Sequence, residues 1–223
     1  PYTTLFRSFL SVYGEKDTRK ILENSLEIPE TFIRVNTSKI NADDLIELFA
    51  KKDVKAEKVD NINNCLRITQ GSALQNMDEY KNGLFHMQDI SSQRAALSVS
   101  AEEGQRVMDC CAAPGGKTFI LSQIVGENGE VFASDLYQRR VDEMNRRKNI
   151  LGLNNIVSRT LDMTKYYPEL GEFDRVICDA PCSGYGTIRR NPEIKYQKPK
   201  EFLELPKLQL KLLSNAAKYC KKD

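Results

Sequence analysis

A glycine-rich turn between a predicted strand and a predicted helix is the strongest chemical signal in the sequence. Residues 109–118 read DCCAAPGGKT, where a strand expected over 106–110 ends and a helix expected over 116–125 begins. Glycine lets a backbone approach a ligand closely, and the first N–H groups of a helix are free to bind one. The segment therefore predicts a ligand-binding loop, although a single Gly-Gly pair is often only a turn.

Aspartates follow several predicted strands of the same region: Asp109, Asp135, Asp162 and Asp179. Ligands of doubly wound sheets bind at the carboxyl ends of the parallel strands, where these four residues would lie. Asp135 comes twenty residues after Gly115, a spacing at which an acidic residue typically holds ribose hydroxyls. Asp162 could accept a hydrogen bond from an adenine amino group. An aspartate after a strand is often only a helix cap, so the prediction depends on all four positions agreeing.

A thiol follows the last of these strands. Residues 174–186 read DRVICDAPCSGYG, so a buried strand leads into a loop that carries Asp179 and Cys182. A thiolate that adds to C6 of a pyrimidine makes C5 nucleophilic enough to take a methyl group. Basic neighbours favour the thiolate, and Arg189 and Arg190 lie close in sequence. The alternative interpretation is that Cys182 is a small buried residue.

Basic residues form two groups. Arg139, Arg140 and residues 146–148 fit a solvated helix face, whereas Arg189, Arg190 and Lys195 directly follow the cysteine loop and suit phosphate contacts. Tyr185 and Tyr196 could stack on bases. The formal net charge is only +2, so any site for a polyanion must be local.

Composition excludes several classes of protein. The 223 residues are 40% apolar, with no apolar run of about 18 residues, which predicts a folded protein without a membrane-spanning helix. The single histidine, His86, excludes a His-rich metal site and makes a Ser-His-Asp triad unexpected. The cysteines form no C-x-x-C pair, so zinc-ribbon and thioredoxin motifs are absent and no metal is expected. Without a recognisable secretion signal, reduced thiols in the cytoplasm are the expectation. His86, Cys110, Cys111 and Cys178 are interpreted as structural residues.

The elements that position these residues predict two parts. Residues 1–80 are expected to form a small α+β subdomain, with helices over 16–26 and 42–52 (capped by Asn41) and strands over 32–35 and 65–69. Residues 81–223 alternate strands with helices, which predicts a parallel sheet covered on both faces. The expected elements of this second part are strands over 106–110, 130–134, 155–160 and 173–178, helices over 116–125 and 137–151, and a last helix near Pro206.

One alternative comes from the turn itself. Gly116-Lys117-Thr118 resembles the end of a phosphate-binding P-loop, and the strand before Asp179 could serve an NTPase. That motif requires glycine at position 111, where this sequence has cysteine. An NTPase therefore stays a minor alternative.

Taken together, these motifs resemble the Nop/Sun family of RNA cytosine-5 methyltransferases, most closely its bacterial small-subunit rRNA branch. The matching residues are 111–117 (CAAPGGK), Asp135, Asp162, residues 179–184 (DAPCSG), residues 189–195 (RRNPEIK), 33–36 (IRVN) and 88–92 (QDISS). The resemblance covers nearly the whole chain. It implies a Rossmann-like α/β methyltransferase fold with a small N-terminal α+β subdomain on the RNA-binding side.

The same resemblance implies S-adenosylmethionine as cofactor and 16S rRNA as partner, with monomer favoured. The expected cofactor-binding residues are Cys111, Ala112, Ala113, Pro114, Gly115, Gly116, Lys117, Asp135, Arg140, Asp162 and Asp179. Asp179 is expected to lie at the edge of the reacting base, and Cys182 is expected to act in release of the methylated product. The family's attacking cysteine belongs to a later Thr-Cys motif, expected beyond Asp223. We therefore expect a chain truncated at both ends, preceded in the family by an RNA-binding domain.

Two further hypotheses stay open at this stage. A non-catalytic RNA-binding module of the same fold is expected if the full-length protein lacks the Thr-Cys motif. A DNA methyltransferase is less expected, because the residues around its Pro-Cys thiol differ from Asp-Ala-Pro-Cys-Ser-Gly.

Overall fold

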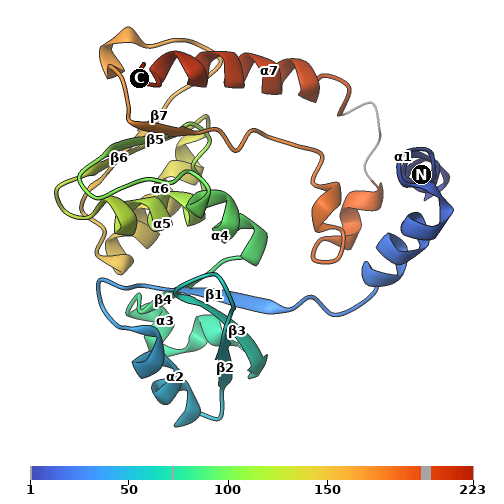
Figure 1. Cartoon of the computed structure of the whole chain (residues 1–223), viewed down its shortest axis with the longest axis horizontal. Coiled ribbons are helices and arrows are strands. Elements are labelled where there is room, and N and C mark those ends of the chain that lie inside the picture. Colours follow the sequence, from blue (N-terminus) through green and yellow to red (C-terminus); the bar gives the residue numbers. More distant parts are fainter. Residues whose placement is uncertain (1, 72, 197–201, 223) are drawn as a thin grey trace. The chain divides into compact units, whose positions relative to one another are not determined.

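The computed structural model describes residues 2–71, 73–196 and 202–222, without the side chains of residues 2–5 and 195 (Figure 1). It divides into two compact units, which are described separately. The larger unit contains Glu30–Ala180 and Lys211–Asp223, and the smaller contains Pro1–Pro29 and Pro181–Leu210. The division predicted between residues 80 and 81 stays a prediction. No helix in the described ranges has the length and apolar character to cross a membrane.

The first part of the larger unit is an antiparallel sheet in the order β2-β3-β1-β4. Its strands are β1 (Thr31–Val35), β2 (Lys55–Lys58), β3 (Cys65–Gln70) and β4 (Phe85–Met87), with helices α2 (Ala42–Ala50), η1 (Leu74–Asn76) and α3 (Asp78–Lys81). The predicted start of α2 is confirmed, because the Asn41 side chain accepts a hydrogen bond from the Asp44 N–H at 2.9 Å. A buried apolar cluster that includes Ile33, Phe49 and Phe85 joins the sheet to its helices.

The second part is a parallel sheet in the order β7-β6-β5-β8. Its strands are β5 (Arg106–Asp109), β6 (Glu130–Asp135), β7 (Ile156–Thr160) and β8 (Arg175–Ile177), and η2 (Pro168–Leu170) lies in the connection before β8. Helices α4 (Ile90–Leu97), α5 (Gly116–Val125) and α6 (Gln138–Leu151) lie on one face, and the end of α7 (Leu205–Ala216) lies on the other (Figure 1). The predicted doubly covered parallel sheet is confirmed.

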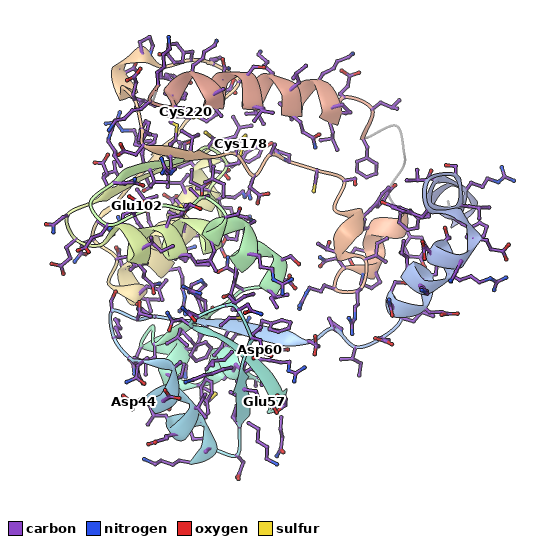
Figure 2. The ribbon with its side chains drawn as sticks, viewed as in Figure 1. Asp44, Glu57, Asp60, Glu102, Cys178 and Cys220 are labelled. Carbon is purple, nitrogen blue, oxygen red and sulfur yellow. The ribbon has the colours of Figure 1, made fainter. Side chains whose placement is uncertain are left out.

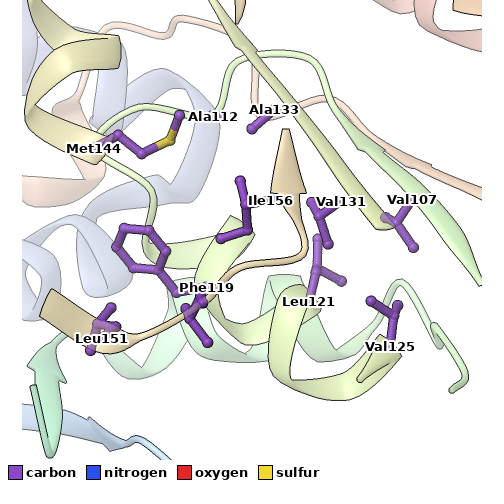
Figure 3. Packing of buried hydrophobic residues seen from close by; sticks show 11 residues of the cluster. Val107, Ala112, Phe119, Leu121, Val125, Val131, Ala133, Met144, Leu151 and Ile156 are labelled. Atoms are coloured by element: carbon purple, nitrogen blue, oxygen red, sulfur yellow. The ribbon is translucent and has the colours of Figure 1, made fainter. Parts of the chain in front are cut away.

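The core of this second part explains why its alternation of strands and helices could be predicted from the sequence. Val107, Val131 and Ile156 come from three neighbouring strands and pack against Phe119 and Leu121 of α5 (Figure 3). Parallel strands buried on both faces give continuous apolar runs, which the sequence shows. The helix predicted over 116–125 has those bounds in the structure.

The last predicted strand is shorter in the structure. The last strand predicted over 173–178 is β8, which spans only Arg175–Ile177. Phe173 instead forms an isolated parallel bridge with Cys220: its N–H donates to the Tyr219 carbonyl at 2.7 Å, and its carbonyl accepts from the Lys221 N–H at 2.9 Å. The partners are far apart in sequence, so local pattern could not indicate them.

The two sheets of the larger unit are joined by a polar seam. The Asn36 side chain donates to the Gly83 and Leu151 carbonyls, each at 2.8 Å. Lys39 donates to the carbonyl of Ile150 at 2.7 Å, and Arg147 donates to two carbonyls of the N-terminal part at 2.6–3.0 Å. Asn36 is fully buried, so its hydrogen bonds replace those it would make to water.

The smaller unit contains α1 (Tyr2–Asn24), η3 (Tyr185–Thr187) and η4 (Pro192–Tyr196). The helix predicted over 16–26 is the second part of α1, which is kinked at Gly14 where φ is 72°. Arg189 donates to the carbonyl of Ile28 at 2.6 Å and contacts the Glu27 carboxylate at 3.4 Å. This unit therefore links the segment after α1 to the segment after η3 by a charged side chain.

Candidate active site

The parallel sheet places the four aspartates at its carboxyl edge. Strands β5 and β6 end at Asp109 and Asp135, and Asp162 and Asp179 each lie two residues beyond the last residue of β7 and β8. All strands of this sheet run in the same direction, so these residues share one end of it. Their ligand-binding roles stay predictions, because the four carboxylates have different surroundings.

The glycine-rich turn depends on two glycines for its shape. Gly115 has a φ of 107°, and a Cβ there would lie 2.3 Å from the Phe119 ring. A Cβ on Gly116, the first residue of α5, would lie 3.2 Å from the Gln88 amide group. A side chain at either position would displace a packed neighbour, so the turn holds the start of α5 close to Gln88. The peptide bond between Ala113 and Pro114 is cis.

Asp109 supports the turn from inside. Its side chain is buried, accepts a hydrogen bond from the Thr118 hydroxyl at 2.7 Å and accepts another from the Cys111 N–H at 3.4 Å. Burial raises the pKa of Asp109 to about 6, against the opposing effect of the Thr118 hydrogen bond. The geometry makes Asp109 a positioning residue for the turn.

Asp135 and Arg140 form a second support for the turn. The Asp135 carboxylate is buried, accepts from the Ala113 N–H at 3.3 Å and lies 3.2 Å from the Arg140 guanidinium. Arg140 also donates to the carbonyl of Ala113. The residue predicted to hold ribose hydroxyls is therefore also bound to the backbone of the turn.

Asp162 is more open than Asp135. One of its carboxylate oxygens accepts from the Thr164 N–H at 3.0 Å and from the Thr164 hydroxyl at 2.7 Å. The hydroxyl contact lowers the pKa of Asp162, which stays ionised near neutral pH. The other oxygen lies 3.8 Å from the Lys165 amine, at the edge of ion-pair range.

Lys117 and Asp179 form an ion pair across the edge of the sheet. The Lys117 amine lies 2.6 Å from the Asp179 carboxylate; the exposed fractions of the two side chains are 17% and 56%. Lys117 therefore fixes a carboxylate that keeps an open side. The pair joins the glycine-rich turn to the segment that follows β8.

A cavity of about 660 Å³ lies beside this pair. Its walls include Cys111, Lys117 and Asp179 from the sheet edge, Gln88 from the segment after β4, and Arg147 from α6. The other lining residues from the predicted site are Ala112, Ala113, Pro114 and Gly116. The cavity is large enough for a nucleoside-sized ligand. Gly115, Asp135, Arg140 and Asp162 are not among the residues that line it.

Sequence reasoning missed a hydrogen-bonded group on the cavity wall. Buried His86 donates from Nε2 to the Gln88 Oε1 at 2.9 Å, and the Gln88 amide donates to the Ser92 hydroxyl at 3.0 Å. Burial lowers the pKa of His86 to about 4, so its ring is neutral at pH 7. The only sequence signal was the position of Gln88 in a motif that comes before the turn.

Two family models match the chain. One, described as 16S rRNA methyltransferase RsmB/F, matches residues 96–223. The other, the ferredoxin-like domain of RsmF/B-like methyltransferases, matches residues 3–75.

The chain belongs to the RsmB/F family of methyltransferases.

Curated relatives of this RsmB/F chain act on ribosomal RNA according to their names. It is 32% identical over 221 residues to the "Probable ribosomal RNA small subunit methyltransferase B" of Bacillus subtilis, covering 98% of the chain and 49% of that protein. It is 30% identical to the human "28S rRNA (cytosine(4447)-C(5))-methyltransferase", covering 85% of the chain and 24% of that protein. The RsmB/F chain thus spans about half the length, or less, of these relatives.

A solved structure shares the fold of this RsmB/F chain. NSun6 from Pyrococcus horikoshii, crystallised with SFG, an analogue of S-adenosylmethionine, matches 97% of the chain and 79% of its own chain with a TM-score of 0.89. At 18% sequence identity this likeness shows the fold alone. The resemblance seen in the motifs and the predicted fold class are both confirmed.

The remaining predicted residues of the RsmB/F chain lie in the smaller unit. Cys182 is exposed, and Arg190 is exposed as well. Arg189 is half-buried against the segment after α1, and the side chain of Lys195 lies outside the described residues. The predicted RNA contacts of Arg189, Arg190 and Lys195 stay predictions. Among the described side chains, no group of three or more His, Cys, Asp or Glu residues is placed to hold a metal ion.

Proposed function

We propose that this protein transfers a methyl group from S-adenosylmethionine to C5 of a cytosine in ribosomal RNA. The observation that carries the proposal is the Lys117–Asp179 ion pair at the rim of the 660 Å³ cavity, in a chain of the RsmB/F family. Support for 16S rRNA as the substrate comes from the description of the family model.

The residues present fit the proposed cofactor. The absence of a Cβ at Gly116 lets the start of α5 pack against the Gln88 amide at the cavity wall, and the N-terminus of α5 offers free N–H groups there. The open side of the Asp179 carboxylate can accept from an ammonium group, and Cys111 and Lys117 complete the wall. When bound, S-adenosylmethionine supplies an electrophilic methyl group on a sulfonium sulfur. Asp135 and Asp162 are proposed to bind its ribose and adenine.

The chain's own residues have distinct proposed roles in the reaction. Asp179 accepts a hydrogen bond from the exocyclic amine of the cytosine and holds the base in place, while the Lys117 amine, 2.6 Å away, holds the Asp179 carboxylate in position. A cysteine thiolate adds to C6, and the proton at C5 leaves after methylation. Cys182 acts in release of the methylated product, with the attacking thiol in the later Thr-Cys motif of the family. An RNA substrate is consistent with a cytoplasmic location, which is proposed on that ground.

Two of the three alternatives from the sequence, the NTPase and the non-catalytic module, have no support in these findings. The P-loop of an NTPase begins with a glycine, and this chain has Cys111 at that position. Neither family model indicates a non-catalytic RNA-binding module, and the model that matches residues 96–223 describes a methyltransferase.

Cofactor binding is tested first by calorimetric titration of the protein with S-adenosylmethionine. Lys117→Met should weaken binding at least tenfold, because it frees the Asp179 carboxylate. Lys58→Met is the matched control: its ion pair to Asp43, at 2.7 Å, joins β2 to α2, away from the residues that line the cavity, and 59% of its side chain is exposed. ATP should not bind. Binding of ATP in place of S-adenosylmethionine would refute the proposal in favour of the NTPase.

The reaction is tested with the full-length protein on unmodified 16S rRNA, 23S rRNA and DNA. Methyl transfer to C5 of cytosine in 16S rRNA alone is the expected result. Cys182→Ala should accumulate a covalent protein–RNA adduct, seen as a band that survives denaturing electrophoresis. Cys220→Ala, another exposed cysteine, should not. Normal product release by Cys182→Ala would refute the role of Cys182.

A further inference from the structure

Three thiols meet where β5 and β8 end. Cys110 and Cys111 directly follow β5, and Cys178 directly follows β8. The register pairs Asp109 with Ile177, and the Cys110 N–H continues the ladder by donating to the Ile177 carbonyl at 3.0 Å. Cys110 and Cys178 are therefore opposite each other on adjacent strands, a separation within disulfide range. Figure 2 labels Cys178 in this region.

The Cys178 thiol differs from the other two. Contact with the Cys110 and Cys111 thiols lowers the pKa of Cys178, and contact with Cys178 raises the pKa of each of the other two. A thiol with a lowered pKa reacts more readily with peroxides, because the thiolate is the reacting form.

The reactive thiol is also within reach of solvent. Cys178 is half-buried and lines a cavity of about 370 Å³ together with Lys117 and Ser98. Cys111 is half-buried and lines the larger cavity, whereas Cys110 is buried. A small oxidant can therefore approach Cys178 while its two partner thiols stay in contact with it.

We propose that Cys178 is an oxidation site that forms a disulfide with the Cys110-Cys111 pair. The oxidant is a hydroperoxide such as hydrogen peroxide. The Cys178 thiolate attacks one peroxide oxygen, the O–O bond breaks, and the hydroxide that leaves takes up a proton to become water. Cys178 is then a sulfenic acid. The thiolate of Cys110 or Cys111 attacks its sulfur, the S–O bond breaks, and a second water leaves. Two thiols are oxidised and one peroxide is reduced.

The disulfide would act on the cofactor site. One end lies at the start of the glycine-rich turn, and the other directly precedes Asp179. Drawing these two segments together changes the walls that Cys111, Lys117 and Asp179 give to the large cavity. Oxidation is expected to reduce the affinity for S-adenosylmethionine at least tenfold, and dithiothreitol is expected to restore it. This consequence rests on the proposed function.

The disulfide itself is tested by peptide mapping of the folded protein. After hydrogen peroxide, alkylation and trypsin without reductant, peptides 107–117 and 176–189 should be joined, and fragmentation should place the bond on Cys178. Cys178→Ser should abolish the link. Cys182→Ser, which alters the other cysteine of the same peptide, should keep it. A link through Cys182, or oxidation of Cys178 to a sulfinic acid with no link, would overturn the proposal.

Cofactor titration of the oxidised and reduced protein then tests the regulatory consequence. A tenfold loss that Cys178→Ser prevents supports it, and unchanged affinity in fully linked protein refutes it. If neither form binds S-adenosylmethionine, the proposed function fails, while the peptide map still decides the disulfide.

Discussion

Replacing His86 with glutamine should make the protein more tolerant of acid. The His86 ring is 4% exposed, packs edge-on against Phe119 at a centroid distance of 5.6 Å and donates to Gln88. Burial, together with the positive charges of Arg147 and Arg34, lowers the pKa of His86 to about 4. Glutamine at this position keeps an N–H donor for Gln88 and binds no proton.

The size of the effect follows from linkage. An unfolded histidine titrates near a pKa of about 6.5, so between roughly pH 6.5 and 4 the unfolded chain binds more protons than the folded protein. The free energy of unfolding therefore falls as the pH falls through this range. The loss at pH 4.5 relative to pH 7 is on the order of 2.5 kcal/mol. His86→Gln removes this loss and costs about 1 kcal/mol at pH 7 through poorer packing.

Urea unfolding followed by circular dichroism at pH 7.0, 5.5 and 4.5 measures this difference. The variant should be the less stable protein at pH 7 and the more stable one at pH 4.5. Asp109, whose raised pKa makes stability fall as the pH rises from about 4 to 6, titrates in both proteins and cancels in the comparison. Val131→Ala, a core truncation that removes no titrating group, should cost the same at each pH.

The result that would refute this reasoning is a stability difference between variant and wild type that does not change with pH. In that case the folded protein would protonate His86 as readily as the unfolded chain does. Water or movement at the cavity wall would then reach the ring, contrary to its burial.

Three other substitutions test the packing. Gly83→Ala should lower the free energy of unfolding in urea by more than about 2 kcal/mol, because its Cβ would lie 2.3 Å from a carbonyl oxygen of α6. Gly104 has a similar positive φ but open space around it, so Gly104→Ala should cost only about 1 kcal/mol. Equal losses in the two variants would contradict the clash at Gly83. Thr118→Val should lower the free energy of unfolding by about 1–3 kcal/mol, because it removes the hydrogen bond to the Asp109 carboxylate. The loss should be larger at pH 8, where Asp109 is ionised, than at pH 5, where it is protonated. A larger loss at pH 5 would be inconsistent with the raised pKa of Asp109. Arg189→Ala should speed amide hydrogen exchange at the end of α1, and unchanged exchange would show that its contacts there contribute nothing.

Much of the parallel sheet could be predicted because its signals are local. The helix expected over 137–151 is α6, which ends at Leu151 as predicted and is followed by Gly152 with a φ of 76°. The start of α5 at Gly116 is where the sequence predicts it. The strands expected over 106–110 and 130–134 end one residue from those bounds, at Asp109 and Asp135. Such signals require no knowledge of distant parts of the chain.

What could not be predicted depends on partners far apart in sequence. The motif indicated where Asp135 lies but not that its carboxylate would bind the backbone of the turn. The charge of Arg189 predicts contacts with RNA, which stay a prediction, but it could not indicate that the guanidinium contacts a carbonyl 161 positions earlier in the chain. Strand β4 has three residues, too few for a periodic pattern, yet it leads directly to Gln88. In each case tertiary contacts decide what a side chain does.

The polar seam has a consequence for how such proteins diverge. Asn36, Lys39 and Arg147 donate across it to main-chain carbonyls, and Thr37 donates from its N–H and its hydroxyl to the Gln123 side chain of α5, each at 3.0 Å. Every amino acid offers a carbonyl, so the hydrogen bonds to carbonyls do not by themselves determine which residues lie on the accepting side. A hybrid that joins the N-terminal sheet of one relative to the parallel sheet of another should therefore keep this seam if Asn36, Lys39, Arg147 and the Thr37–Gln123 pair are retained.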